Sequence, residues 1–511
     1  MFALKGFCAL LIGLLLAPTL LHGEEEPAPL FLTHGVASGD ITTRSAVIWT
    51  RVNAPATVGV EYALDPNFTQ PQAGPRVVTD QTRDYTARLK LSGLRPDTVY
   101  FYRVWALQPE TGLRSVSVRG RLRTAPPATE RRAVSFVFGG DLGGQRFCRP
   151  YDIFEKMRRL EPDFFIANGD MIYADNDCPA ATPAPPGRVS RPNVPGDFLP
   201  VTALDWTNLD QLRTVFWQHW RYNRADPAFQ NFLAQVPMYV QWDDHELVND
   251  SGASWSYWRP GPRRGYPNLV RVGRQAMFLY APIDAHPEEP YRVYRSFRWG
   301  ADLELFLLDA RSYRSRNDLA DTPEAHKTLL GSAQLAWLKR GVAESTATWK
   351  VVSSNVPLSI PTGSRAAVFG RDGWANGTAP NFSSRTGFER ELFNLLAHFD
   401  RAGVRNLVFV TTDVHFAAAL AYAHDADGDG RPLRFHEFVS GPLSAISVPA
   451  VSQDRLDPSL RPRLVYAEGE LTNFGFIRVY EGADGVGRLG AEVRGEDGLL
   501  RPGSRVELVA E

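Results

Sequence analysis

The sequence predicts an α/β protein in which an N-terminal β-sandwich precedes a larger domain of alternating strands and helices. Three observations support this: apolar residues alternate with period two before residue 127, strand-helix-strand patterning begins at Arg132, and strand after strand ends in a polar residue. At 511 residues the chain is long enough for two or three domains. A formal net charge of −1 argues against nucleic-acid-specific binding, which normally requires a basic excess.

The chain opens with a segment typical of an export signal. Lys5 supplies a positive charge, Gly6–Leu21 is an almost unbroken apolar run, and three glutamates begin a polar sequence at Glu24. The run is short for a spanning helix, and no later stretch is apolar enough to form a stable membrane span. We therefore expect residues 1–23 to be a cleaved signal rather than a membrane anchor, and the mature protein to be secreted or periplasmic.

Residues 30–127 are predicted to be all-β. Apolar and polar residues alternate over Ser45–Thr50 and again over Thr86–Leu91, with turn residues such as those at Asp65 between them. This pattern is typical of half-buried strands. The prolines of Thr124–Ala128 then predict a short linker.

One stretch of this region, LSGLRPDTVYFYRV from Leu91, carries a specific local signal. It resembles the leucine-proline-tyrosine corner of a fibronectin type III sandwich, matched at Leu94, Pro96, Thr98, Tyr100 and Tyr102. The resemblance implies a sandwich of about 100 residues in which a tyrosine hydroxyl returns to the backbone at the corner. A packing domain with no chemistry of its own is the favoured interpretation.

A βαβ unit follows the linker. The strand Ala133–Phe138 leads to Asp141, the helix Tyr151–Leu160 presents one apolar face, and the strand Phe164–Ala167 leads to Asp170. Because parallel strands of such a unit end at the same edge of a sheet, both carboxylates are expected at that edge.

Later strands repeat this arrangement. The predicted strands are Met238–Trp242, Leu303–Leu308, Val351–Ser353 and Leu407–Val410, and the chain ends in a hairpin of Phe474–Tyr480 and Leu489–Val493. The residues that follow the strands include Asp244 with His245, Asn355, and Asp413 with His415. Oxygen-rich sites with one or two imidazoles suit hard or borderline cations. Asp170 lies centrally and could bridge two ions, which together could clamp a phosphoryl group.

Cysteine usage points to an oxidising compartment. Of the three cysteines, Cys8 leaves with the signal, so Cys148 and Cys178 remain as an even pair. We expect a disulfide between them. Two free thiols, or a thiolate that binds metal, are the alternatives.

Five motifs, taken in order, resemble one family. They are GDLGGQ from Gly140, NGDMIYAD from Asn168, QWDDHE from Gln241, TTDVHF from Thr411 and NFGFIRV from Asn473. The set resembles the alkaline phosphatase D (PhoD-like) family of calcineurin-superfamily metallophosphoesterases, from about Ala133 to the end of the chain. The resemblance implies a four-layer αββα metallophosphoesterase domain over residues 132–511.

The same resemblance implies a metal centre, position by position. The implied ligands are Asp141, Asp170, Tyr173, Asp244, Asn249, Asp413 and His415. Asp170 would bridge two ions and contribute to catalysis, and Tyr173 would be a tyrosinate that favours ferric iron. His245 takes the place of the catalytic histidine. The implied cofactor is a dinuclear or trinuclear centre of Fe³⁺ with Ca²⁺, and the residues are also compatible with Zn²⁺ or Mn²⁺.

The sequence departs from the family pattern at three places. No twin-arginine precedes the apolar run, Thr412 stands where the family typically has glycine, and Asp141 replaces the cysteine found in part of the family. The last change favours harder ions.

Several neighbouring residues have two interpretations each. Asp243 either caps a turn beside a metal-binding Asp244 or shares its role, and Glu246 is interpreted as orienting His245. Arginines that could contact phosphate but are more commonly solvated are Arg149, Arg311 and Arg314. His424–Gly430 resembles a calcium loop, but a surface turn is favoured because the terminal glutamate is missing.

These observations predict an exported metal-dependent phosphoesterase. It would hydrolyse phosphomonoesters, phosphodiesters or both by attack of metal-bound hydroxide, since the sequence has neither a nucleophile elbow nor a P-loop. Its substrate would be a small molecule, a lipid or a polymer that carries a phosphate ester. One alternative is a phospholipase D-like phosphodiesterase whose apolar entrance is formed by Pro179–Pro200, Trp255 and Trp258. Another is a catalytically silent envelope binding protein.

Overall fold

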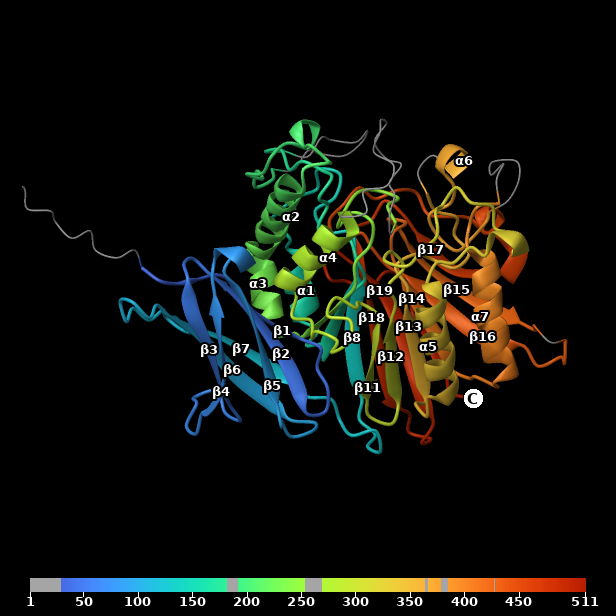
Figure 1. The fold of residues 1–511 in the computed structure, drawn as a ribbon. Helices are drawn as coiled ribbons and strands as arrows, with labels where there is room; N and C mark the ends of the chain where they lie inside the picture. Colours follow the sequence, from blue (N-terminus) through green and yellow to red (C-terminus); the bar gives the residue numbers. More distant parts are fainter. Residues whose placement is uncertain (1–28, 182–191, 253–268, 364–365, 378–384, 427) are drawn as a thin grey trace, which may run out of the picture.

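The computed structural model describes residues 29–181, 192–252, 269–363, 366–377, 385–426 and 428–511 (Figure 1). The predicted export signal, Trp255, Trp258 and the central part of Pro179–Pro200 lie outside the described residues. Within the described ranges, no helix has the length and apolar character needed to cross a bilayer.

The N-terminal strands form the predicted sandwich. One layer has the strand order β1 (Leu32–Gly39), β2 (Ser45–Val52), β5 (Thr86–Ser92), and the other has the order β4 (Gln72–Thr79), β3 (Ala56–Ala63), β6 (Val99–Leu107), β7 (Val118–Arg123). The hydroxyl of Tyr100 accepts a hydrogen bond of 2.8 Å from the backbone N–H of Arg95, which confirms the predicted tyrosine corner.

The sandwich is joined to the rest of the chain through one of its own sheets. β1 pairs in parallel with β10 (Met238–Val240) at Gly39 and Met238, so β1, β2 and β5 extend a nine-stranded sheet. The first residues of the predicted linker pack against the sandwich. Ala125 is buried, and its N–H donates to the Thr42 carbonyl over 3.1 Å. Sandwich and α/β region therefore share a continuous hydrophobic core.

Two sheets face each other in the α/β region. The nine-stranded sheet is completed by β8 (Val134–Gly139), β9 (Phe164–Ala167), β18 (Asn473–Glu481), β19 (Gly487–Gly495) and β20 (Val506–Val509). The second, seven-stranded sheet runs in the order β11 (Arg295–Trp299), β12 (Leu303–Leu307), β13 (Trp349–Ser353), β14 (Leu407–Thr411), β16 (Leu433–Val439), β15 (Ala417–His424), β17 (Arg463–Glu468). Their facing sides bury apolar residues from both sheets, such as Phe136 and Leu305.

Helices cover the two outer faces (Figure 1). The nine-stranded sheet packs against α1 (Ile153–Arg158), α2 (Leu209–Arg224), α3 (Pro227–Leu233) and α4 (Leu269–Tyr280). The seven-stranded sheet packs against α5 (Gly331–Glu344) and α7 (Glu389–Arg401), while the short α6 (Ala366–Phe369) lies at the upper edge. This order of helix, sheet, sheet and helix confirms the predicted four-layer fold class.

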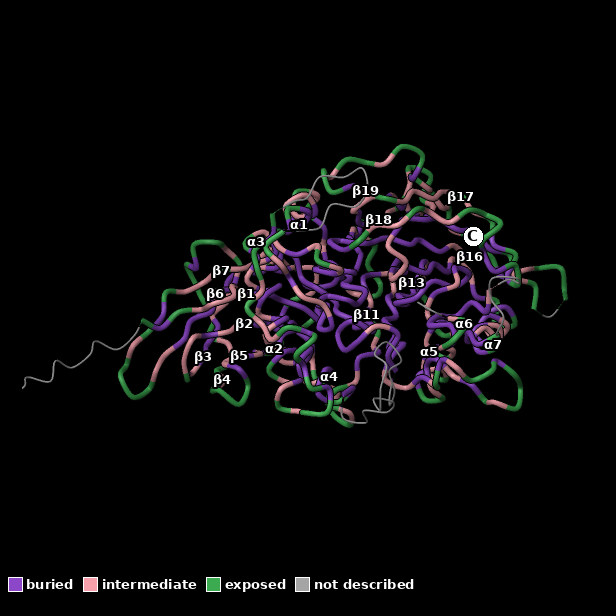
Figure 2. The backbone as a smooth tube through the Cα atoms, turned by 90° about the horizontal axis from the view of Figure 1, so that it is seen from above, coloured by how far each residue is buried: buried purple, intermediate pink, exposed green. Residues whose placement is uncertain are grey.

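The strands are in register at one end. β8, β9 and β10 are parallel with Gly139 opposite Ala167 and Ala167 opposite Val240, and β12, β13 and β14 are parallel in the other sheet. The polar residues that follow these strands therefore meet at one edge, as expected. Figure 2 shows that the middle of the molecule is buried, whereas the exposed residues lie mostly on peripheral loops.

Candidate metal centre

The residues expected to bind metal stand on unusual backbone. Four of them have positive φ angles: Asp141 (62°), Asp170 (50°), Asp413 (77°) and His415 (60°). Residues other than glycine rarely adopt this left-handed region, and such positions concentrate at functional sites. All four residues lie shortly after the end of a strand, namely β8, β9 or β14.

Two glycines allow the strand ends to approach one another. A Cβ atom on Gly140 would lie 2.5 Å from the carbonyl oxygen of Gly169. A Cβ atom on Gly169, whose φ is 111°, would lie 2.6 Å from the Cβ of Asp243. Any larger residue at either position would separate the loops that follow β8, β9 and β10.

One group of donor atoms comes from three loops. The phenol oxygen of Tyr173 lies 3.1 Å from Nε2 of His415 and 3.5 Å from Oδ1 of Asp141. Nε2 of His415 is 3.4 Å from the same Asp141 oxygen. Nδ1 of His415 lies 2.5 Å from the Ile446 carbonyl, and donation to that oxygen leaves Nε2 available for a metal.

A second group of donor atoms includes Asp170. Asp170, Asp244 and His245 each offer a ligand atom within 4.8 Å of the others, and Asp243, Asp244 and Asp413 do the same. Among the described residues, Oδ1 of Asp244 is buried without a hydrogen-bond partner. Such an acceptor is normally satisfied, so its isolation is what a bound cation would explain.

The electrostatics of the site also fit a cation. Burial, followed by repulsion from Asp244 and Asp243, raises the pKa of Asp170 well above its usual range. Burial, followed by the charges of Asp170 and Asp141, likewise raises the pKa of Tyr173. A multivalent ion reverses both shifts because it stabilises ionised donors, so the residues present fit a metal centre.

His245 is oriented by an aspartate of the Asp170 motif. Its Nδ1 atom lies 2.7 Å from Oδ1 of Asp175, and its ring stacks on Tyr173 with centroids 4.0 Å apart. Burial lowers the pKa of His245, but the carboxylates of Asp175 and Asp244 outweigh burial and raise it to about 9. Asn249 lies at the same edge, where its backbone N–H donates to Asp175 over 3.0 Å.

Among the described residues the imidazole of His245 is hydrogen-bonded by Asp175 and not by the neighbouring Glu246, so the interpretation of Glu246 as the residue that orients it is wrong. Its carboxylate accepts hydrogen bonds from the backbone N–H groups of Asp170 (2.9 Å), Met171 (2.7 Å) and Asp243 (2.8 Å). Glu246 therefore ties the loop after β9 to the loop after β10, because backbone amides at both loops need an acceptor.

The three arginines considered as phosphate contacts have different surroundings. Arg311 and Arg314 are buried and form ion pairs with Asp372, so the expectation that they are solvated is wrong for both. Arg311 also donates to Asp243. The Arg149 guanidinium lies over the ring of Tyr222, 4.2 Å from its centroid.

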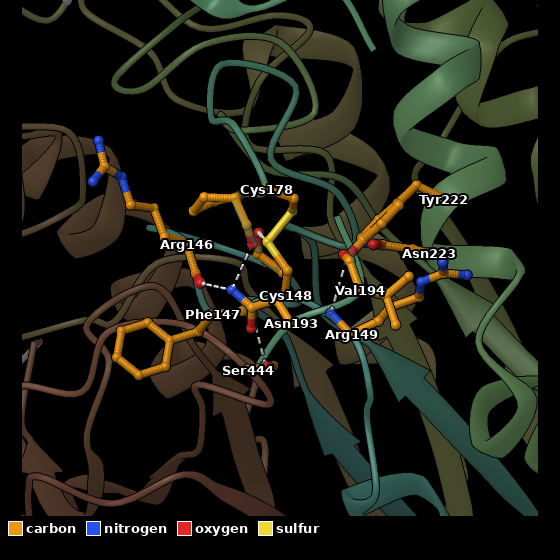
Figure 3. Close-up of a disulfide and its surroundings, with 12 residues drawn as sticks. Arg146, Phe147, Cys148, Arg149, Cys178, Asn193, Val194, Tyr222, Asn223 and Ser444 are labelled. Atoms are coloured by element: carbon orange, nitrogen blue, oxygen red, sulfur yellow. Dashed lines mark hydrogen bonds between the residues drawn. A yellow bond between two sulfur atoms is a disulfide. The ribbon is translucent and has the colours of Figure 1, made fainter. Parts of the chain in front are cut away.

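A disulfide between Cys148 and Cys178 joins two loops of the site (Figure 3). The first loop follows Asp141 and the second follows Tyr173. Asn193 strengthens the connection, because its side-chain amide donates to the carbonyls of Arg146 (2.9 Å) and Pro179 (3.1 Å). The covalent link therefore limits how far apart the loops that carry the candidate ligands Asp141 and Tyr173 can move.

Sequence reasoning missed three acidic residues at this edge. Asp175 was not identified as the partner of His245, and Asp250 and Asp372 were not identified as neighbours of Asp244, with which they share a cluster of ligand atoms within 4.8 Å. Asp372 follows no strand, so no pattern singled it out. In the turn at His424–Gly430, the Asp425 carboxylate accepts from the N–H groups of Gly428 and Gly430, as a surface turn would.

Comparisons with family models and with a known protein point to the same family. The model described as "PhoD-like phosphatase" matches residues 139–480, and the model of the "PhoD-like phosphatase, N-terminal domain" matches residues 17–126. The protein named alkaline phosphatase D from Bacillus subtilis (strain 168) is 26% identical over 476 residues, which cover 85% of this chain and 73% of that protein.

Two solved structures share the fold. The structure titled "Structure of PhoD" has a TM-score of 0.72 at 19% identity and covers 94% of this chain and 92% of its own. Purple acid phosphatase PPD1 from yellow lupin (Lupinus luteus) seeds has a TM-score of 0.59 at 11% identity and covers 94% and 74%. At these identities the two structures show the fold alone.

Proposed function

The chain belongs to the PhoD-like phosphatase family, and from this premise we propose that it is an exported, metal-dependent hydrolase of phosphomonoesters, phosphodiesters or both. One observation carries the proposal: Asp170, Asp244 and His245 offer ligand atoms within 4.8 Å of one another, and Oδ1 of Asp244 is buried without a partner among the described residues. Since the matched models are those of a phosphatase, the alternative of a silent binding protein is not retained.

The residues divide into two sets of ligands. Asp141, Tyr173 and His415 would hold one ion, and Asp170 would bridge it to a second. The second ion would be held by Asp244, Asn249 and Asp413. When bound, the ions would offset the charge of the phosphoryl oxygens and lower the pKa of a water molecule. Fe³⁺ with Ca²⁺ is the pair that the family resemblance favours, and Zn²⁺ or Mn²⁺ is compatible with the same donors.

His245 is proposed as the proton donor to the leaving group. Asp175 holds its Nδ1 atom, which leaves Nε2 as the atom that can give a proton to the departing oxygen. The stacked Tyr173 ring limits rotation of the imidazole. Asp175 is therefore a positioning residue, whereas His245 would contact the substrate.

Export is supported by two features. The N-terminal segment has the pattern of a cleaved signal, and the disulfide is of the kind that persists in oxidising compartments. We therefore propose that the mature protein is secreted or periplasmic.

The test compares two chromogenic substrates. The mature protein, Asp170→Asn and Asp177→Asn are assayed with p-nitrophenyl phosphate and bis-p-nitrophenyl phosphate, and metals are measured on the same samples. Asp177→Asn is the matched control, since this carboxylate accepts a hydrogen bond from the backbone of Val201. We expect metal-dependent turnover that is lost in Asp170→Asn alone, and the ratio of the two rates assigns monoester or diester preference. A protein that holds no metal and cleaves neither ester would overturn the proposal.

A further inference from the structure

Thr412 directly follows β14, and its side chain contacts the candidate ligand Asp141. The hydroxyl of Thr412 donates a hydrogen bond of 2.6 Å to Oδ2 of Asp141, and both residues are buried. A hydroxyl that donates to an ionised carboxylate at this length forms a charge-assisted bond, about twice as strong as a neutral one. Since β14 belongs to the seven-stranded sheet and Asp141 follows β8 of the nine-stranded sheet, the bond joins the two sheets at the edge of the candidate metal centre.

The two carboxylate oxygens of Asp141 have different neighbours. Oδ1 lies 3.5 Å from the phenol oxygen of Tyr173 and 3.4 Å from Nε2 of His415, which are the other candidate ligands of the same ion. Oδ2 accepts the hydroxyl of Thr412 instead. One oxygen of the carboxylate therefore lies among the candidate ligands, while the other is bonded to a side chain that is not a candidate ligand.

The backbone of Gly441, in the loop after β16, lies against the same bond. A Cβ atom on Gly441 would collide with Oδ2 of Asp141 and would lie 2.6 Å from the hydroxyl oxygen of Thr412, so only glycine allows this close approach. Gly441 is itself held by the side-chain amide of Asn473, which accepts its N–H over 3.1 Å and donates to its carbonyl over 2.6 Å. Asn473, the first residue of the NFGFIRV motif, thus fixes the backbone that encloses Oδ2.

The direction of the Thr412 hydroxyl is also restricted. The N–H of Thr412 donates to the carbonyl of Asn355 over 3.1 Å, which fixes the backbone. The side chain packs closely on the other side, because a Cβ atom on Gly140 would lie only 3.1 Å from the Thr412 methyl carbon. Since a β-branched side chain has few accessible χ1 rotamers, backbone and packing together hold the hydroxyl toward Oδ2.

We propose that Thr412 is a positioning residue of the metal centre: its hydroxyl holds Oδ2 of Asp141, so that Oδ1 is presented to the ion shared with Tyr173 and His415. The proposal rests on the proposed function, since it requires a metal at these three donors. Carboxylates that bind metals are commonly held by a hydrogen bond of this kind, which fixes the orientation of the ligand.

Two substitutions separate the hydrogen bond from the packing of Thr412. Thr412→Val keeps a side chain of similar shape but removes the donor, so Oδ2 of Asp141 loses the group that fixes it. Thr412→Ser keeps the hydroxyl and removes the methyl group that packs beside Gly140. A role of the hydroxyl predicts that valine weakens metal binding and serine does not, whereas a role of packing alone predicts the reverse.

The experiment measures metal retention in the full-length mature protein. Wild type, Thr412→Val, Thr412→Ser and Thr411→Val are loaded with the metals found in the wild type. Release into a competing chelator is then followed, bound metal per chain is counted, and thermal unfolding is recorded on the same samples. Thr411→Val is the matched control, because the hydroxyl of this neighbouring buried threonine donates to Glu437 over 3.0 Å, and Glu437 is not a candidate ligand.

We expect about 10–100-fold weaker metal retention in Thr412→Val, with Thr412→Ser and Thr411→Val close to the wild type. If Thr412→Val does not fold, Thr412→Ala decides the question, because it removes the hydroxyl without placing a methyl group against Oδ2. Unchanged retention in the variant that lacks the hydroxyl, or an equal loss in Thr412→Ser or Thr411→Val, would refute the assignment while leaving the proposed function intact. A wild type that binds no metal would refute the proposed function itself, and the assignment with it.

Discussion

His245 and Asp175 form a buried pair in which Nδ1 of the imidazole lies 2.7 Å from a carboxylate oxygen. The carboxylate is itself fixed, because its other oxygen accepts the backbone N–H of Asn249. Burial raises the pKa of Asp175, but the interaction with His245 outweighs burial, so the pKa lies below its usual value. The pair therefore favours a histidine that carries a proton and has one orientation.

Replacing Asp175 by asparagine is expected to reduce kcat more than it changes KM. Proton donation typically contributes about 10²–10⁴-fold to a rate, so we expect a loss in that range for alkyl phosphates, whose leaving oxygen needs the proton. The loss should be smaller for p-nitrophenyl phosphate, whose leaving group departs readily as an anion. Steady-state kinetics on both substrates test this, with His245→Asn as reference and Asp177→Asn as control. Equal losses on both substrates would contradict the proton-donor role.

Much of the fold could be predicted because its signals are local. Apolar runs such as Phe164–Ala167 mark buried strands, and the tyrosine corner at Tyr100 is a short-range motif. The pairing of β1 with β10 could not be predicted, because Gly39 and Met238 are far apart in sequence and neither carries a pairing signal. Continuity of the sandwich with the nine-stranded sheet is a property of tertiary packing.

The residues of the candidate site likewise include some that the sequence could predict and some that it could not. Residues that directly follow strands, such as Asp141 and Asp170, were found from pattern and family resemblance. Residues that act through another side chain were missed or misassigned. Glu246 was expected to orient His245, but its carboxylate accepts hydrogen bonds from backbone amides, and Asp372 follows no strand. A single sequence does not show which buried charge pairs with which.

Removal of the disulfide is expected to lower both stability and metal retention. Cys148 and Cys178 are 30 residues apart, and closing a loop of that size stabilises a protein by about 3–4 kcal/mol in the chain-entropy model. The link also holds the loops that follow Asp141 and Tyr173 together. For the double variant Cys148→Ala/Cys178→Ala, denaturant unfolding measures the loss of stability, and release of metal into a chelator measures the loss of retention. Wild type treated with dithiothreitol should give the same results as the double variant. Unchanged metal release in the double variant would show that the disulfide acts on stability alone.

The sandwich is expected to unfold together with the α/β region. Arg295, at the start of β11, donates to both oxygens of Asp40, which follows β1, and the Asp284 N–H donates to the same carboxylate. Asp40→Asn keeps a residue that tolerates the positive φ there but removes the charge, so we expect a loss of about 1.5–3 kcal/mol. Calorimetry should show one transition at a lower temperature. Asp152→Asn, at an exposed residue whose side chain makes no capping hydrogen bond, should stay near the wild type. Two separate transitions would contradict the shared core.

His219 is expected to make the protein less stable in mild acid. It lies in α2 against Phe198, and burial lowers its pKa from the usual 6.5 to about 3. Between these values the unfolded chain binds a proton that the folded protein does not. The contribution of neutral His219 to the free energy of unfolding is therefore fully present above about pH 6.5. It declines as the pH falls toward 3, by up to about 1.4 kcal/mol per pH unit.

The variant His219→Phe should remove this dependence while keeping an aromatic contact with Phe198. We expect the free energy of unfolding in urea to fall by about 2 kcal/mol more in the wild type than in the variant between pH 6.5 and pH 5. His34 and His436, whose pKa values burial also lowers, to about 3 and about 4, contribute equally to both proteins and cancel in the difference. The exposed His326→Asn serves as control. Parallel stability curves for the wild type and His219→Phe would show that His219 is not the source of the acid sensitivity.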